Sequence, residues 1–250
     1  MRNDYSPFMQ LGLSLPPVGV KFSYFKPEGI TPLESDASMS WCEMLVMAQT
    51  ENRSFFFSKT HTETCVGKIL LGMEDMAPFA EAGEIGERLG MFEEPRCNRH
   101  FYQFVPKLAK GTTNYVLFSA LEKLTFEPDV LVVAAKPEQA EIVMRSITYS
   151  TGEMYQSCCT PVMGCAWLML QPVVTGKVNF IIPALVHGLH GRQLYPSDTL
   201  LIGIPYQWIP TALTNLVRMH HQLEGHRDKE HYHAEFGGII SDLARRSQNP

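Results

Sequence analysis

Residues 20–28 read VKFSYFKPE and residues 130–138 read VLVVAAKPE, so an extended apolar run ending in Lys-Pro-Glu recurs after 110 positions. The correspondence resumes at an offset of 123 positions, which relates Cys42 to Cys165. The two offsets differ by 13 residues, and we assign this difference to one inserted helix at 140–152. Because internal repetition determines architecture before any single motif does, we expect an internally duplicated, pseudo-twofold protein in which the two cysteines are equivalent.

Short β-branched or aromatic runs closed by Pro, Gly or Lys predict strands. They lie at residues 18–25, 54–59, 115–120, 130–135, 178–182 and 200–204. Stretches with helical spacing, opened by a proline or by Ser38 or Ser40 as the N-cap, predict helices. These are residues 38–50, 137–148, 161–170 and 205–221. The alternation of strands and helices favours an α/β fold with mixed sheets and covering helices.

The duplication also predicts the domain organisation. The first half spans residues 15–125, and the second half spans residues 126–218. Residues 74–113 are rich in acids and poor in strand formers, and they have no counterpart of similar length in the second half. We therefore expect them to form a helical insertion. The polar, His-rich tail at 219–250 is expected to dock on a partner subunit, giving a homo-oligomer, or to remain mobile.

The composition restricts the function. The net charge of −5 and the absence of a basic stripe argue against nucleic-acid binding. No apolar run reaches the roughly 18 residues that a membrane span needs, and the start of the chain lacks a signal-like apolar core. We therefore expect a soluble cytoplasmic protein. Six cysteines in that setting indicate thiols or metal ligands rather than a disulfide scaffold.

Three cysteines stand at predicted helix starts. Cys42 lies one turn into a helix, Cys65 follows a strand and precedes an apolar helix, and Cys165 lies early in the matching second helix. The positive end of a helix dipole is expected to lower the pKa of such thiols and to favour thiolate. Three converging thiolates suit a [4Fe-4S] cluster with one open iron, with zinc as the weaker alternative. Each cysteine taken alone is more often a small buried core residue than a ligand.

His61 is the candidate acid–base residue because it precedes Cys65 by four positions. The sequence His61-Thr62-Glu63 resembles the His-x-Glu of zinc deaminases, but the Pro-Cys-x-x-Cys partner motif of those enzymes is absent from the sequence. Deamination is therefore rejected. A histidine that serves only the core or the surface remains the alternative for His61.

Together these segments resemble the family known as domain of unknown function 169, also called ArCR. The matching motifs are PPVGVK at 16–21, WC at 41–42, TCVG at 64–67, FEPDV at 126–130, KPEQA at 136–140, TYSTGE at 148–153 and GIPY at 203–206. The resemblance covers about residues 15 to 218 and implies that Cys42, Cys65 and Cys165 are the recurring cysteines. The family usually continues Pro-Gly-Gly after the second cysteine, whereas this chain has Val66-Gly67-Lys68. The resemblance implies no agreed reaction.

Three functions follow from these observations. The first is an iron–sulfur enzyme acting on a small molecule by reductive heteroatom removal or lyase-type chemistry, with His61 moving protons. The second is a non-catalytic accessory protein that binds a small molecule or cofactor between its two halves, with Trp41, Trp167 and Tyr206 lining the cleft. The third is metal-free thiol chemistry with Cys65 as the nucleophile.

Overall fold

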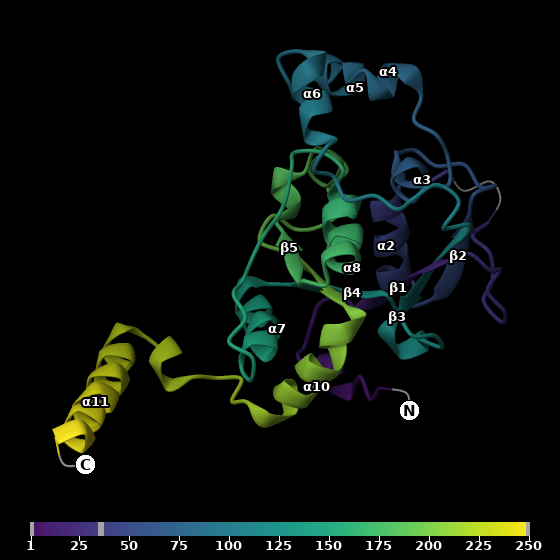
Figure 1. Cartoon of the computed structure of the whole chain (residues 1–250). Helices are drawn as coiled ribbons and strands as arrows, with labels where there is room; N and C mark the ends of the chain where they lie inside the picture. The colour runs from purple at the N-terminus through teal and green to yellow at the C-terminus, as the bar shows by residue number, and fades with distance from the viewer. Residues whose placement is uncertain (1–2, 35–37, 249–250) are drawn as a thin grey trace.

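The computed structural model describes residues 3–34 and 38–248. Within these residues, one six-stranded sheet runs through the middle of the molecule in the order β2-β3-β1-β4-β6-β5 (Figure 1). The strands are β1 (Val18–Ser23), β2 (Ser54–Ser58), β3 (Tyr115–Ala120), β4 (Val130–Ala135), β5 (Asn179–Ile181) and β6 (Leu200–Pro205). All six lie where the sequence predicts strands, and the predicted α/β fold is confirmed.

The sheet is antiparallel in every pairing of its strands, which corrects the expectation of mixed sheets. Parallel pairing among the described residues is confined to two isolated bridges, Pro32–Phe56 and Met39–Glu63. At the centre, β1 and β4 share a register of three residue pairs, with Gly19 opposite Leu131. Asp129, just before β4, extends this short contact because its carboxylate accepts a hydrogen bond from the Phe22 amide at 2.7 Å.

One face of the sheet carries α2 (Trp41–Thr50), the π-helical turn η2 (Ala166–Leu170) and α8 (Gln171–Thr175). Their apolar side chains form one core with the residues of β1, β2 and β3 that point to this face. Close approach of η2 to the sheet depends on Gly203 of β6, where an added Cβ would lie 2.1 Å from the Leu168 carbonyl oxygen. This face therefore brings the starts of α2 and η2 onto the same core.

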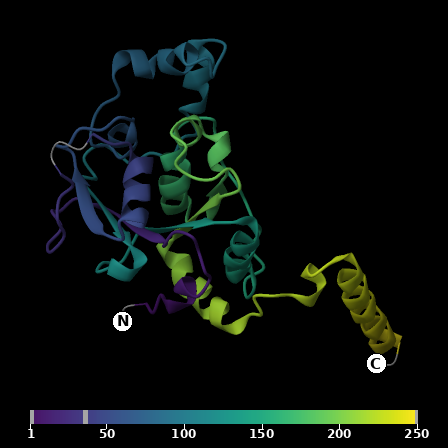
Figure 2. The ribbon, with the colours of Figure 1, turned by 180° about the vertical axis from the view of Figure 1, so that it is seen from behind.

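The opposite face is covered by α1 (Ser6–Met9), α7 (Pro137–Thr148) and α10 (Ile209–Arg218). Seen from behind, the N-terminal segment runs beside α10 on this side (Figure 2). Shorter elements complete the two layers. They are η1 (Leu121–Lys123), η3 (Pro183–Leu185), α9 (His187–Gly191) and η4 (Tyr206–Trp208).

Residues 74–113 contain three short helices, α4 (Pro78–Glu81), α5 (Glu84–Arg88) and α6 (Pro95–Phe101). In Figure 1 they arch over the edge of the molecule above α3 (Gly67–Leu70). Phe101 and Val105 join the core beneath α2 and η2. The insertion is thus helical, and it is anchored to the same core that carries the three cysteines.

The strand order is the same in both halves when read outward from the centre. It runs β1, β3, β2 on one side and β4, β6, β5 on the other, and α7 is the element that the second half has in addition. This order agrees with the correspondence of residues 20–28 and 130–138. Duplication itself, and the division into halves at residue 125, stay predictions.

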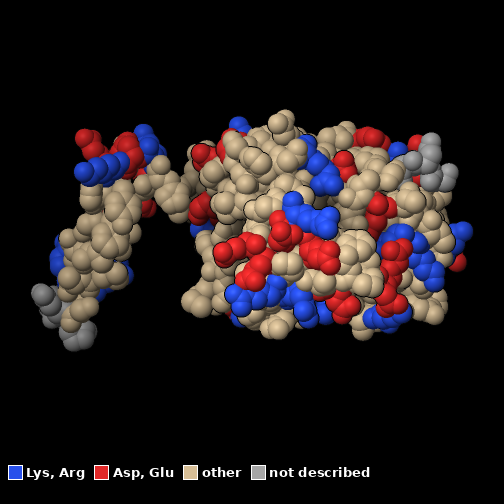
Figure 3. Space-filling model, turned by 90° about the horizontal axis from the view of Figure 1, so that it is seen from above, with Lys and Arg blue, Asp and Glu red and all other residues tan. Residues whose placement is uncertain are grey.

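The chain after α10 leaves the body. It forms η5 (Glu224–His226) and the helix α11 (Lys229–Gln248), which stands apart from the sheet and its helices in every view (Figures 1 to 3). On the face seen in Figure 3, lysine and arginine are interspersed with aspartate and glutamate. No helix within the described residues combines the length and apolarity needed to cross a membrane.

Candidate functional site

Cys42 is held in place by the start of α2. Ser40 is the N-cap: its hydroxyl accepts a hydrogen bond from the Glu43 amide at 3.3 Å, and the Glu43 carboxylate accepts one from the Ser40 amide at 2.7 Å. This reciprocal capping box satisfies two amides that a helix start leaves without partners. The first turn is therefore fixed, with Trp41 buried in the core and Cys42 half-buried beside it.

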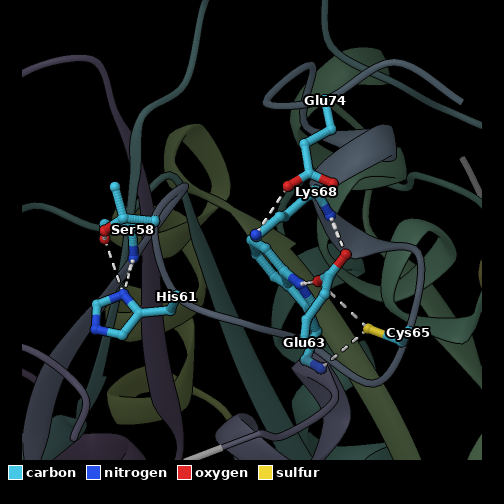
Figure 4. Close-up of polar contacts among 8 residues, drawn as sticks. Ser58, His61, Glu63, Cys65, Lys68 and Glu74 are labelled. Atoms are coloured by element: carbon cyan, nitrogen blue, oxygen red, sulfur yellow. Dashed lines mark hydrogen bonds and ion pairs between the residues drawn. The ribbon is translucent and has the colours of Figure 1, made fainter. Parts of the chain in front are cut away.

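Glu63 links the first turn of α2 to the segment that carries Cys65. One carboxylate oxygen accepts a hydrogen bond from the Lys68 amide at 2.9 Å. The other accepts hydrogen bonds from the Trp41 indole and from the Cys65 thiol, the latter at 3.6 Å (Figure 4). The Trp41 amide in turn donates to the Cys65 sulfur at 3.5 Å. Cys65 is thus fixed against the start of α2.

This arrangement requires a glycine at position 67. An added Cβ on Gly67 would lie 1.9 Å from the Trp41 indole nitrogen, far inside van der Waals contact. The indole therefore packs directly on the backbone at the start of α3. Gly67 keeps Trp41 in position to donate to Glu63.

Cys165 comes from the second half, directly before η2, and is buried. Its thiol lies close enough to the Cys42 side chain and to the Glu63 carboxylate for both of them to raise its pKa. Cys165 in turn raises the pKa of Cys65. The three cysteines singled out in the sequence therefore gather at one place, from three separate segments.

The prediction that helix starts lower the thiol pKa values is wrong for two of these cysteines. Burial raises the pKa of Cys65 far above its usual range, and the nearby charges of Cys165 and Glu63 add to the shift. The pKa of Cys165 is also raised, by the neighbouring Cys42 side chain and by burial. Desolvation disfavours the charged thiolate more strongly than short helix starts favour it. Without a cation these two thiols stay protonated at neutral pH.

The carboxyl of Glu63 has a raised pKa as well. Burial raises it, and hydrogen bonds from Lys68, Trp41 and Cys65 offset that effect only in part. Such a carboxyl holds a proton more readily than an exposed glutamate does. It is therefore a titratable group in direct contact with Cys65.

Lys68 supplies the positive charge nearest to Glu63. Its side chain is buried, and its ammonium forms an ion pair with Glu74 at 2.8 Å (Figure 4). The ammonium also lies 5.7 Å from the centre of the Phe57 ring. Sequence reasoning missed Glu63 and Lys68 as site residues. The sequence did offer one signal, the spacing Glu63-x-Cys65-x-x-Lys68 in the segment after β2. An acid and a base this close in the chain can pair with each other or with nearby groups, and buried charges need such partners.

His61 lies apart from the thiols and serves the backbone. Its Nδ1 accepts hydrogen bonds from the Ser58 amide at 3.0 Å and the Ser58 hydroxyl at 2.8 Å (Figure 4). This leaves Nε2 to donate to the Leu33 carbonyl at 3.0 Å, and the ring packs on Phe57. Both nitrogens are occupied in closing the turn after β2, so this placement gives the predicted acid–base role of His61 no support.

Arg192, at the end of α9, ties the two halves together at the rim of the site. Its guanidinium lies 3.6 Å from the Glu43 carboxylate and donates to the Thr64 carbonyl at 3.4 Å. Tyr195, close by in the chain, is buried and donates to Gln49 of α2 at 2.8 Å. The second half therefore holds both the first turn of α2 and the Cys65 segment.

The other cysteines lie elsewhere. Cys158 is exposed and its backbone is held by Asn179, Cys159 is half-buried, and Cys97 lies in α6 of the insertion. The three aromatic residues expected to line a common cleft do not do so, because Trp41 and Trp167 are core residues and Tyr206 is bonded to Glu127 on the surface.

Space and donor geometry at the three thiols are tight. The cavity beside Cys165 has a volume of about 10 Å³ and apolar walls that include Trp41, Gly67 and Met169. In the part of the chain that the structure describes, no three or more His, Cys, Asp or Glu side chains are already arranged to hold a metal ion. The donor types suit a soft metal, but the side chains would have to separate to admit one.

Comparison with known proteins gives one finding. The model of the family described as uncharacterised ArCR, domain of unknown function 169, matches residues 9–215. No curated protein and no solved structure is significantly similar to the chain. The match spans the whole sheet and all three clustered cysteines, and it ends before the tail. This chain therefore belongs to the ArCR family, domain of unknown function 169.

Proposed function

We propose that Cys42, Cys65 and Cys165 ligate an iron–sulfur cluster, and that the protein is an enzyme acting on a small molecule. The observation that carries the proposal is the meeting of three cysteine side chains, from three segments of the chain, at one core. A thiol ligates a soft metal as thiolate. Binding of a cationic group would supply the positive charge that stabilises these buried sulfurs as thiolates.

The donor set fits a cluster better than it fits a harder ion. Three cysteine sulfurs are ligands for an iron–sulfur cluster with one open iron, with zinc as the weaker alternative. A cavity of about 10 Å³ is too small for such a group. Loading therefore requires the Cys65 segment and α3 to move away from η2. Cys42 and Cys65, which are half-buried, would give access from the surface.

When bound through three thiolates, such a cluster supplies a Lewis-acidic iron for a substrate oxygen or sulfur, suited to lyase chemistry or, with an external electron donor, to reductive heteroatom removal. Glu63 would hold or release a proton next to the substrate, because its pKa is already raised by burial. Lys68 would balance the charge of Glu63 once the thiols are ionised. In this proposal Glu63 takes the proton-transfer role first assigned to His61.

The test is anaerobic purification of the full chain without an affinity tag, followed by a visible spectrum and assays of iron, acid-labile sulfide and zinc. We expect a brown protein with near-equal iron and sulfide that is colourless as the Cys65→Ser variant. Cys97→Ser is the matched control, because Cys97 lies in the insertion away from the three thiols. Zinc in place of iron would support the weaker alternative, and a metal-free wild-type protein would remove the proposal.

A binding function without catalysis is favoured by a separate observation. A cavity of about 240 Å³ lies between the end of α7, the loop at 153–156 and Trp208, with both apolar and polar walls. It lies within the second half, not between the halves as the sequence led us to expect. An organic ligand here should quench Trp208 fluorescence, and Trp208→Phe should abolish that signal. Absence of any ligand copurifying with or bound by the metal-free protein would argue against this alternative.

Cys65 as a metal-free nucleophile is less well supported. Nucleophilic attack needs a thiolate population near neutral pH, and burial drives the pKa of Cys65 in the opposite direction. Faster alkylation of Cys65 than of the exposed Cys158 at neutral pH would restore this third reaction class.

A further inference from the structure

The helix α11 carries an apolar stripe that nothing in its own chain covers. Tyr232, Phe236, Ile239 and Leu243 are spaced by four, three and four residues, which places them on one face of a helix. With the adjacent Ile240 they are between 49% and 53% exposed. Every residue from 229 to 247 is exposed except His231, which is half-buried. The stripe is therefore a continuous seam open to solvent.

The helix needs a partner for physical reasons. Most of the stability of a helix in a protein comes from packing of its apolar face, and Gly237 and Gly238 at the centre of α11 each cost about 1 kcal/mol relative to alanine. Main-chain contacts join it to η5, and Tyr232 stacks on Phe236 within the helix. These local contacts leave the seam uncovered, so burial of the seam must supply the stability that the sequence of the helix lacks.

We propose that the seam docks on the same helix of a second copy of this chain, with the two helices antiparallel. An antiparallel pair places Tyr232 and Phe236 of one copy opposite Leu243 and Ile239 of the other, so that each aromatic ring faces an aliphatic side chain. A parallel pair would place the rings against one another. The antiparallel contact repeats about a twofold axis and closes on two copies.

The charges favour the same orientation. Residues 224–235 hold four acids and two bases, whereas residues 236–250 hold one acid and two arginines. Antiparallel pairing brings the two arginines at the end of one helix to the acidic 224–235 segment of the other copy, and it also opposes the two helix dipoles. Parallel pairing would bring like ends together. A seam of three turns is short, so we expect a reversible dimer with a dissociation constant on the order of 10 µM.

Sedimentation velocity of the full chain, from about 1 to about 200 µM, tests the proposal against that affinity range. The wild type should shift from monomer to dimer across this range, and Phe236→Glu combined with Ile239→Glu should remain monomeric. The control is Ser241→Glu, which adds a carboxylate to the opposite face of the helix. A monomeric wild type, or a dimer that persists in the double variant, would overturn the proposal.

Orientation is tested by mixing two variants made in a Cys158→Ser background, which removes the exposed native thiol. Tyr232→Cys and Leu243→Cys should form a disulfide-linked dimer with each other under mild oxidation. Each variant alone should form much less of it. Efficient linking of each variant with itself would show a parallel pair and contradict the proposal. Neither experiment depends on metal content, so its outcome is independent of the proposed function.

Discussion

At the scale of single residues, Cys42 and Cys165 lie close enough together for Cys42 to raise the pKa of Cys165. Both stand at helix starts on the same core. We expect Cys42→Ser and Cys165→Ser to lose the same property together, measured as iron bound per chain after anaerobic purification. If one substitution is silent and the other abolishes binding, the two thiols do not act as a pair.

Gly67→Ala should disrupt the contact between Trp41 and the start of α3. The added methyl group overlaps the indole, and overpacking of this severity should cost about 2 kcal/mol or more of unfolding free energy. Urea unfolding measures the loss, and Trp41 fluorescence reports the displaced ring. Gly191→Ala is the matched control, since an added Cβ there meets no atom within 4 Å. Equal stability of the two variants would contradict this packing.

The sequence predicts some residues of the site and not others, for identifiable reasons. The cysteines could be found because each one stands near a helix start. In addition, Cys42 and Cys165 lie at corresponding positions of the repeated sequence pattern. The pKa values of the cysteines could not be found in this way, since these depend on burial by segments that are distant in the sequence. The same holds for Glu63, whose partners become visible only when the loop folds back on Trp41.

At the scale of elements, the pairing of β1 with β4 joins the two halves in one sheet. Only three residue pairs form it, and Asp129 adds a hydrogen bond to the Phe22 amide and a 4.0 Å contact with Lys21. Burial raises the pKa of Asp129, and the partners Phe22 and Lys21 offset this only in part. Ionisation of this carboxyl is therefore less favourable in the folded protein than in the unfolded chain.

Ionisation of Asp129 makes the free energy of unfolding depend on pH. Because the folded-state pKa of Asp129 is the higher one, its ionisation lowers the free energy of unfolding as pH rises from the ordinary aspartate range to the folded-state pKa. Asp129→Asn cannot ionise and keeps an acceptor for Phe22. Urea unfolding from about pH 3.5 to about pH 6 should show the wild type losing stability relative to this variant. A wild type that gains relative stability over that range would contradict the assigned direction.

Element boundaries were less predictable than element existence. The six strands lie where their composition places them, but the helix expected at 161–170 has its π-helical turn at Ala166–Leu170. Asn179 holds Cys158, and Trp167 donates to Thr160, which keeps the residues before the turn extended. These are tertiary contacts, and a local sequence pattern does not contain them.

At the scale of the whole molecule, the stability of the sheet and its covering helices should not depend on the C-terminal helix α11. The family match ends at residue 215, and α11 contributes to neither core. A chain of residues 1–227 should keep the thermal midpoint and iron content of the full protein while losing its concentration-dependent dimerisation. Calorimetry and sedimentation measure these properties. A large loss of thermal stability in the truncated chain at low concentration would show that α11 stabilises the rest of the protein.

Under the proposed function, Cys42, Cys65 and Cys165 together hold a single inorganic group. Native mass spectrometry of the full chain, purified and sprayed without oxygen, tests it most directly. We predict a folded species heavier than the polypeptide by the mass of one iron–sulfur cluster, with the excess lost in Cys65→Ser and kept in Cys97→Ser. The bare polypeptide mass for the wild type under the same conditions would contradict the claim.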